Sequence, residues 1–136
     1  MVVRSRREMP IETEDDVILV RRAVKALAAS NGFDVFASAA LTTAASELTR
    51  NVWVHARRGN VTVEELDSGG RVGVRMTFRD QGPGIADIPR VMAGGYSTAR
   101  SMGLGLSGSK RLVDEFALQS EPGQGTTVEV VKWKAV

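Results

Sequence analysis

The chain has 136 residues, of which 43% are apolar and 25% are charged. This composition is typical of a single globular domain that buries a sizeable core, and we expect one domain over residues 1–136. There is no cysteine, which excludes disulfides, thiolate metal sites and a cysteine nucleophile and fits a cytoplasmic location. The lone histidine, His55, argues against a zinc site or a Ser-His-Asp centre.

Charge and hydropathy argue against two classes of partner. The 18 lysines and arginines are scattered and nearly balance the 16 acidic residues, and only 5% of residues are aromatic, so we expect no nucleic-acid partner. No apolar run reaches the roughly 18 residues of a membrane span, and the first residues contain no secretory signal. We therefore also expect no membrane association.

The first half of the chain predicts a strand and two helices. Residues 2–11 alternate loosely, as in an edge strand. Thr13 to Asp16 resemble a capping box with Thr13 as N-cap, and apolar residues follow at helical spacing: Val17, Val20, Val24, Leu27 and Ala28. Asn31-Gly32 is a helix stop. Asp34 caps a second helix to about His55, whose apolar stripe includes Phe36, Ala39, Ala40, Thr43, Ala44, Leu48 and Val52.

The second half predicts mainly strands. A strand through Val61 and Val63 turns at Ser68-Gly69-Gly70 into a return strand that ends at Asp80. Three segments follow: a short helix at 86–93, a mobile loop at 94–102, and a helix at 104–116 with Leu106, Leu112, Val113 and Phe116 facing inward. The last strand begins at Thr126 and continues through Trp133. Together these elements predict an α+β sandwich, in which a mixed, mostly antiparallel sheet carries helices on one face.

The second helix carries two polar residues beside its apolar stripe. Glu47 and Asn51 are four residues apart and share one helix face. A carboxylate and an amide in such a place are costly unless they have partners. The pair by itself fits equally well a binding site or the solvated border of an amphipathic helix. His55 extends the same face by one turn, and we assign it no role.

Three glycine motifs follow along the chain. Asp80-Gln81-Gly82-Pro83-Gly84-Ile85 comes where a strand ends, and its glycines let the backbone approach a planar ligand closely. Gly103-Leu104-Gly105-Leu106 opens a helix that carries Lys110, and helix N-termini attract phosphate. Gly123-Gln124-Gly125-Thr126 opens the last strand. Taken singly, each motif is weak, since the first and third are common turns and the second is not a Walker A loop.

The order of these motifs resembles the GHKL ATP-binding superfamily, which includes gyrase, Hsp90-type chaperones, histidine-kinase catalytic domains and bacterial anti-sigma kinases. Glu47 and Asn51 match its N box, the motifs at Asp80 and Gly103 match its two glycine boxes, and Gly125-Thr126 matches its final Gly-Thr pair. The small size and the segment Ser46–Asn51 most resemble the serine/threonine kinases of bacterial partner-switching systems, in particular the stressosome switch kinases.

This resemblance implies a role for each matching residue. Glu47 would be the general base, and Asn51 would bind Mg²⁺ at the ATP phosphates. Asp80 would accept a hydrogen bond from the adenine amino group, with Thr126 in support. The resemblance further implies that the remaining residues shape the adenine pocket or contact the phosphates: Gly82, Gly84, Ile85, Gly103, Leu104, Gly105, Leu106 and Lys110. Residues 94–102 would close as a lid.

The same resemblance implies partners. The substrate would be a STAS-domain antagonist protein, and the freed kinase would then bind and activate a PP2C-type phosphatase. Two alternatives stay open: an anti-sigma factor kinase that sequesters a sigma factor, and a nucleotide-dependent binding module with little turnover.

Overall fold

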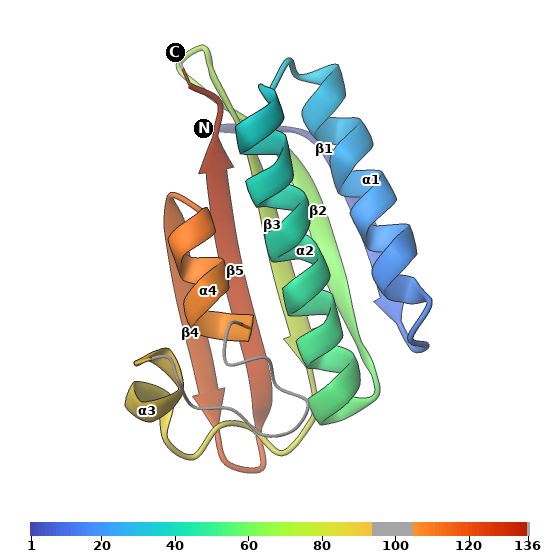
Figure 1. Ribbon diagram of the computed structural model, residues 1–136, viewed down its shortest axis with the longest axis vertical. Helices are drawn as coiled ribbons and strands as arrows, with labels where there is room; N and C mark the ends of the chain where they lie inside the picture. Colours follow the sequence, from blue (N-terminus) through green and yellow to red (C-terminus); the bar gives the residue numbers. More distant parts are fainter. Residues whose placement is uncertain (94–104, 136) are drawn as a thin grey trace.

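The protein is built on a five-stranded sheet with strand order β1-β2-β3-β5-β4, in which every neighbouring pair is antiparallel (Figure 1). The computed structural model describes residues 1–93 and 105–135. In chain order the elements are β1 (Val2–Ile11), α1 (Asp16–Ser30), α2 (Val35–Ala56), β2 (Gly59–Ser68), β3 (Arg71–Asp80), α3 (Ile88–Met92), α4 (Gly105–Leu112), β4 (Glu115–Glu121) and β5 (Gly125–Trp133).

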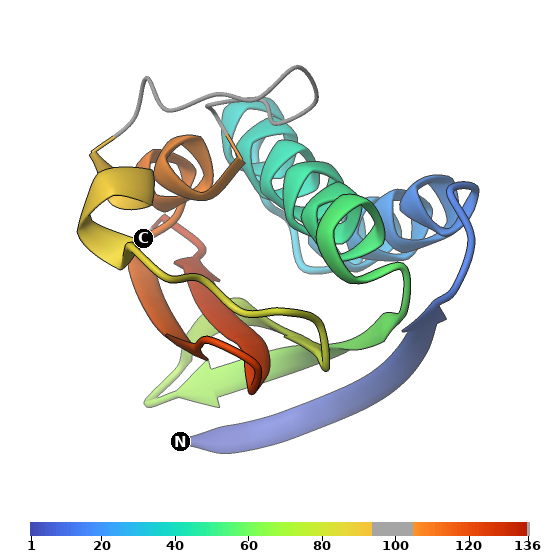
Figure 2. The ribbon, with the colours of Figure 1, turned by 90° about the horizontal axis from the view of Figure 1, so that it is seen from below.

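The helices α1, α2 and α4 lie together on one face of the sheet, so the molecule has two layers (Figure 2). The core fills the space between them. From the sheet it takes alternate residues of the strands, including Val61, Val63, Val74, Met76, Phe78, Val128 and Val130; from the helices it takes Val20, Val24, Ala28, Leu41, Ala44, Ala45, Leu48 and Val52. The expected α+β architecture with helices on one face is confirmed.

Local signals in the sequence place most elements correctly. The strand β1 lies at the edge of the sheet, as predicted for residues 2–11. Asp34 caps α2 by accepting a hydrogen bond from the Ala37 N–H at 2.8 Å, and Gly32 takes a positive φ of 74° after α1. Gly69 and Gly70 both have positive φ in the β2–β3 hairpin, a conformation that favours glycine. No helix among the described residues is long and apolar enough to cross a membrane.

The predicted start of α1 is displaced. Asp15 is the N-cap and the helix begins at Asp16, three residues beyond Thr13. Half of the predicted capping box is present, because the Asp16 carboxylate accepts the Thr13 N–H at 2.9 Å. The same oxygen also accepts the Glu12 N–H at 2.7 Å, and these two bonds hold residues 13–15 in a turn before the helix.

The predicted apolar stripe of α2 was wrong in its first half. Phe36 is 87% exposed, and Ala39 and Thr43 are exposed as well. The buried side of this part of the helix instead contains Leu41 and Ala45. It lies about half a turn around the helix axis from the exposed Ala39 and Thr43. The twelve residues 35–46 carry no charge, so hydropathy alone could not fix which side of the helix is buried.

The predicted helix over 104–116 was also too long. The helix α4 ends at Leu112, and Glu115 begins the strand β4. Asp114 already pairs with the last strand: its N–H donates to the Val131 carbonyl at 2.9 Å, and its carboxylate accepts the Trp133 N–H at 2.7 Å. Leu112 and Phe116 fit a helix as well as they fit the end of a helix followed by a strand, which explains the error.

The face of the sheet away from the helices carries an ion-pair ladder across three strands. The Arg75 Nε lies 2.7 Å from the Glu64 Oε1 and 3.5 Å from the Glu129 Oε1. The hydrogen bond from Arg75 lowers the pKa of the buried Glu64 carboxyl, against the opposing effect of burial. The lowered pKa means that Glu64 contributes stability above its ordinary pKa of 4.5 and loses this contribution as the pH falls through its folded value.

We therefore expect Glu64→Gln to reduce the free energy of unfolding by about 1–3 kcal/mol at pH 7, because it leaves Arg75 without its main charged partner. The difference between the two proteins should shrink as the pH falls below about 4.5 toward the lowered pKa of Glu64 in the folded wild type. Urea unfolding at pH 7 and pH 3 measures both values. An equal difference at the two pH values would show that the ion pair is not the cause.

Candidate active site

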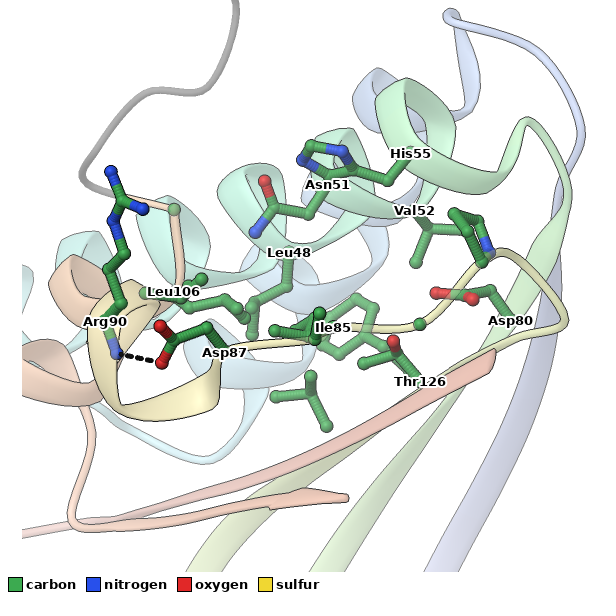
Figure 3. A pocket seen from close by; sticks show the side chains of 17 residues that line it. Leu48, Asn51, Val52, His55, Asp80, Ile85, Asp87, Arg90, Leu106 and Thr126 are labelled. Atoms are coloured by element: carbon green, nitrogen blue, oxygen red, sulfur yellow. Dashed lines mark hydrogen bonds between the residues drawn. The ribbon is translucent and has the colours of Figure 1, made fainter. Parts of the chain in front are cut away.

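A cavity of about 520 Å³ opens between α2 and the ends of β3 and β5 (Figure 3). The segment after β3, the short helix α3 and the start of α4 complete its wall. Its lining is mainly apolar with a few polar groups, as is usual for a small-molecule site: Leu48, Asn51, Val52, His55, Phe78, Asp80, Pro83, Gly84, Ile85, Ala86, Asp87, Arg90, Val91, Gly105, Leu106, Thr126 and Val128. The structure therefore brings residues of all four predicted motif regions to one cavity. Of the first motif, Glu47 and Asn51, it is Asn51 that lines the cavity.

Asn51 enters the cavity from α2 and is packed against the start of α4. A Cβ added at Gly105 would lie 2.7 Å from both the Oδ1 and the Nδ2 of Asn51. Only glycine leaves room for the Asn51 amide at this contact. The close approach fixes the beginning of α4, with its N-terminal backbone, beside the amide.

Asp80 and Thr126 form the opposite side of the cavity, across from Asn51 (Figure 3). They end β3 and begin β5, and they face each other in the sheet register. The Asp80 Oδ1 accepts the Gly82 N–H at 2.9 Å, which fixes the carboxylate at the start of the glycine loop, residues 81–85. A carboxylate fixed in this way, beside a hydroxyl, is suited to accept a hydrogen bond from an amino group of a ligand.

The glycine loop after β3 is held by close backbone contacts. Gly84 has a φ of 77°, and a side chain at this position would collide with the Glu121 carbonyl. Gly82 is not among the described lining residues, but a Cβ there would lie 2.7 Å from the Ala56 Cβ. Both glycines thus allow the loop to lie flat between the end of α2 and the β4–β5 hairpin, and Gly84 and Ile85 line the cavity.

Ser120 on β4 ties this loop to the sheet. Its role was not predicted from the sequence, because the strand β4 itself was not predicted. Its Oγ accepts the Ile85 N–H at 2.8 Å, donates to the Gly125 carbonyl at 2.9 Å and lies 2.8 Å from the Thr126 Oγ1. Ser120 is half-buried behind the lining residues. It therefore positions Ile85 and Thr126 together.

We expect Ser120→Ala to weaken the binding of ATP, the ligand that the resemblance implies, about 10–30-fold. The variant loses the two hydrogen bonds that hold Ile85 and Thr126, at about 1 kcal/mol each. Calorimetric titration with ATP measures the change. Ser30→Ala is a matched control, because the Ser30 hydroxyl also bonds a carbonyl, that of Leu27, on the distant helix α1. Equal affinities for the two variants would show that Ser120 does not support the site.

Glu47 lies one helical turn before Asn51 and is not among the described residues that line the cavity. The Arg50 Nη1 donates to its Oε1 at 3.0 Å. Its Oε2 is buried and has no hydrogen-bond partner among the described residues. One carboxylate oxygen is thus held by Arg50, while the other has no partner among the described residues and can accept a further hydrogen bond.

The structure supports a site role for only one of the remaining predicted residues that it describes. Leu106 lines the cavity, but Lys110 is exposed on α4 and is not among the described lining residues. Gly103, Leu104 and the loop 94–102 lie outside the described residues. Asp87 and Arg90, which were not predicted from the sequence, also line the cavity, at α3. The Asp87 Oδ1 accepts the Arg90 N–H at 3.1 Å.

Residues 37–135 match the family described as histidine kinase-, DNA gyrase B- and HSP90-like ATPase. The chain belongs to this family. The match covers all the elements that build the cavity, from α2 to β5, and it confirms the resemblance inferred from the order of the four motifs.

Relatives narrow the assignment within this family. The chain is 42% identical over 123 residues to the serine/threonine-protein kinase RsbT of Bacillus subtilis, covering 90% of this chain and 92% of RsbT. Similarity at this level makes it a member of the RsbT group of serine/threonine-protein kinases, and therefore an enzyme. It is also 29% identical over 119 residues to the anti-sigma F factor of Thermoanaerobacter sp., covering 83% of this chain and 82% of that factor.

A solved structure supports the fold. The structure of the RsbU and RsbW domains of a Mycobacterium tuberculosis protein superposes with a TM-score of 0.63 at 20% sequence identity. The superposition covers 96% of this chain and 33% of that one, so the present chain spans about a third of its length. At this identity the similarity concerns the fold alone.

Proposed function

We propose that this protein is a cytoplasmic, Mg²⁺- and ATP-dependent kinase that phosphorylates a STAS-domain antagonist protein and then binds and activates a PP2C-type phosphatase. One observation carries the proposal most directly. A single cavity holds the Asp80 carboxylate, which can accept a hydrogen bond from an amino group, on one side and the amide of Asn51 on the other. The Oε2 of Glu47, which has no hydrogen-bond partner among the described residues, lies one helical turn N-terminal to Asn51.

The lining of the cavity supports ATP as the ligand. The apolar surface beside Asp80, formed by Val52, Phe78 and Ile85, suits the faces of an adenine ring. The Asp80 carboxylate would accept the hydrogen bond of the adenine amino group, and Thr126 would support it. The phosphates would then extend toward Asn51 and the start of α4, where the helix N-terminus favours negative charge.

The residues at this end of the cavity also fit Mg²⁺. Among the described residues, no group of three acidic or histidine side chains could hold a metal by itself. Mg²⁺ in nucleotide sites commonly takes only one or two protein ligands together with phosphate oxygens and waters, and the Asn51 Oδ1 is an oxygen ligand of the required kind. When bound, the ion would neutralise charge on the phosphates.

The proposed chemistry is phosphoryl transfer to a serine or threonine hydroxyl. The acceptor oxygen forms a bond to the γ-phosphorus, the bond from that phosphorus to the β–γ bridging oxygen breaks, and ADP leaves. Glu47 would accept the proton of the hydroxyl on its free Oε2, while Arg50 holds the Oε1. The chain contributes mainly positioning and electrostatic stabilisation, as is general for phosphoryl transfer.

An anti-sigma factor kinase is the second candidate, because the chain also resembles anti-sigma F factor over most of its length. A kinase of this second type would bind a sigma factor directly. The lower identity, 29% against 42%, favours the RsbT-like function.

The test combines the purified protein with γ-labelled ATP, Mg²⁺ and a STAS-domain protein encoded near its gene. The proposal predicts that label appears on a serine or threonine of the STAS protein, and that the kinase then raises the activity of a co-encoded PP2C phosphatase. Direct binding of a sigma factor with no effect on the phosphatase would support the anti-sigma alternative. ATP binding without any transfer would indicate a nucleotide-dependent binding module.

A further inference from the structure

The N-terminal half of α2 has an unusual exposed face. Among the described residues, Phe36 and Val35 are the most exposed large apolar side chains, at 87% and 79%. Exposed helix faces normally carry charged residues, yet none of the residues 35–46 is charged. An exposed apolar face with no charged residue, unlike the exposed apolar residues of the charged strand β1, commonly marks a surface that a partner covers.

This face leads along the helix to the catalytic carboxylate. Phe36, Ala40, Thr43 and Glu47 are spaced by four, three and four residues and therefore lie in one line on α2. Ala39 and Thr43 are exposed, and their small side chains leave the helix surface low between Phe36 and Glu47. Helix α2 runs the length of the helical layer, and this line of residues extends along its N-terminal half (Figure 1).

The position of the cavity decides from which side an acceptor protein reaches Glu47. Asn51 and His55 line the cavity one and two turns C-terminal to Glu47, so the nucleotide occupies that part of α2 (Figure 3). The N-terminal part of the same helix is left for the acceptor. From Phe36 to Glu47 the helix rises about 16 Å, at roughly 1.5 Å per residue.

This length matches the size of a protein interface. A typical interface buries about 800 Å² on each partner, which corresponds to a circular patch of about 16 Å radius. A folded protein that delivers a hydroxyl to Glu47 from the N-terminal side would therefore cover the helix as far as Phe36. We infer that the face of α2 formed by Val35, Phe36, Ala39, Ala40 and Thr43 is the docking surface for the phosphoacceptor protein, which would place an apolar patch against Phe36.

This inference rests on the proposed kinase function and is tested with the STAS-domain protein used as acceptor. We expect the double variant Val35→Ser/Phe36→Ser to raise the KM for the acceptor protein at least tenfold, while kcat and the KM for ATP stay within twofold of the wild type. Both side chains are exposed, so the melting temperature should be unchanged. Val2→Ser/Val3→Ser, a second adjacent pair of exposed apolar residues on β1, is the matched control and should keep the wild-type KM.

The outcomes separate this inference from the proposed function. An unchanged KM in Val35→Ser/Phe36→Ser, with transfer still dependent on Glu47, would overturn only the docking surface. A second outcome would also overturn the docking surface: a wild-type protein that sediments as a dimer, with a variant that sediments as a monomer and has an unchanged KM. The face would then be a contact between two copies of this chain. Loss of ATP binding or of transfer from the wild-type protein itself would instead contradict the proposed function.

Discussion

Glu47→Gln is expected to lower the rate of phosphoryl transfer to the acceptor protein by about 10²–10⁴-fold, the usual contribution of a general base. The amide keeps the size of the side chain and can still accept a bond from Arg50, but it cannot take a proton at pH 7. Because Glu47 is not among the described residues that line the cavity, ATP affinity should stay within twofold of the wild type. Single-turnover transfer from γ-labelled ATP measures the rate.

Glu14→Gln is the control for this variant, because Glu14 is exposed before α1 and the same chemical change there should leave transfer unaltered. Transfer by Glu47→Gln at the wild-type rate would show that another group accepts the proton. A parallel loss of ATP affinity would show that Glu47 acts in binding rather than in the chemical step.

Asn51→Ala is expected to weaken ATP binding about 10–100-fold in the presence of Mg²⁺, because it removes the side-chain oxygen with which the protein would bind the ion. With EDTA in place of Mg²⁺ the variant and the wild type should bind ATP with nearly equal affinity. Calorimetric titration under both conditions measures the difference, and it does so without any requirement for turnover.

Gly105→Ala tests the same site from the other wall. A Cβ at this position would lie 2.7 Å from the Asn51 amide and displace it, so this variant should show the same Mg²⁺-dependent loss of affinity.

An equal loss for Asn51→Ala with and without Mg²⁺ would contradict the metal role and leave Asn51 as a direct contact to the nucleotide.

Most of the fold was predictable because its signals are local. The Asp34 cap, the positive φ of Gly32 and the Gly69-Gly70 turn each depend on a few neighbouring residues, and all are present in the structure. The errors arose where the outcome depends on distant contacts. The start of β4 is fixed by hydrogen bonds of Asp114 to Val131 and Trp133, 17 and 19 residues later in the chain. The sequence around Asp114 does not predict these contacts.

The same distinction holds for the site. The ordered motifs allowed the prediction of Asn51, Asp80, Gly84, Gly105 and Thr126, and the structure brings all five to one cavity. What the motifs could not supply are the residues that hold them. Ser120 acts through a hydrogen bond to a loop 35 residues away, so its role became visible only in the folded chain.

The proposed kinase function is tested most directly by identifying the side chain that receives the γ-phosphate. The wild-type protein and Glu47→Gln would each be incubated with Mg²⁺, ATP and the STAS-domain protein, and the products would be analysed by mass spectrometry. We expect one phosphorylated serine or threonine in the STAS protein with the wild-type enzyme and almost none with the variant. Equal phosphorylation by both enzymes, or none by a wild-type enzyme that binds ATP, would contradict this expectation.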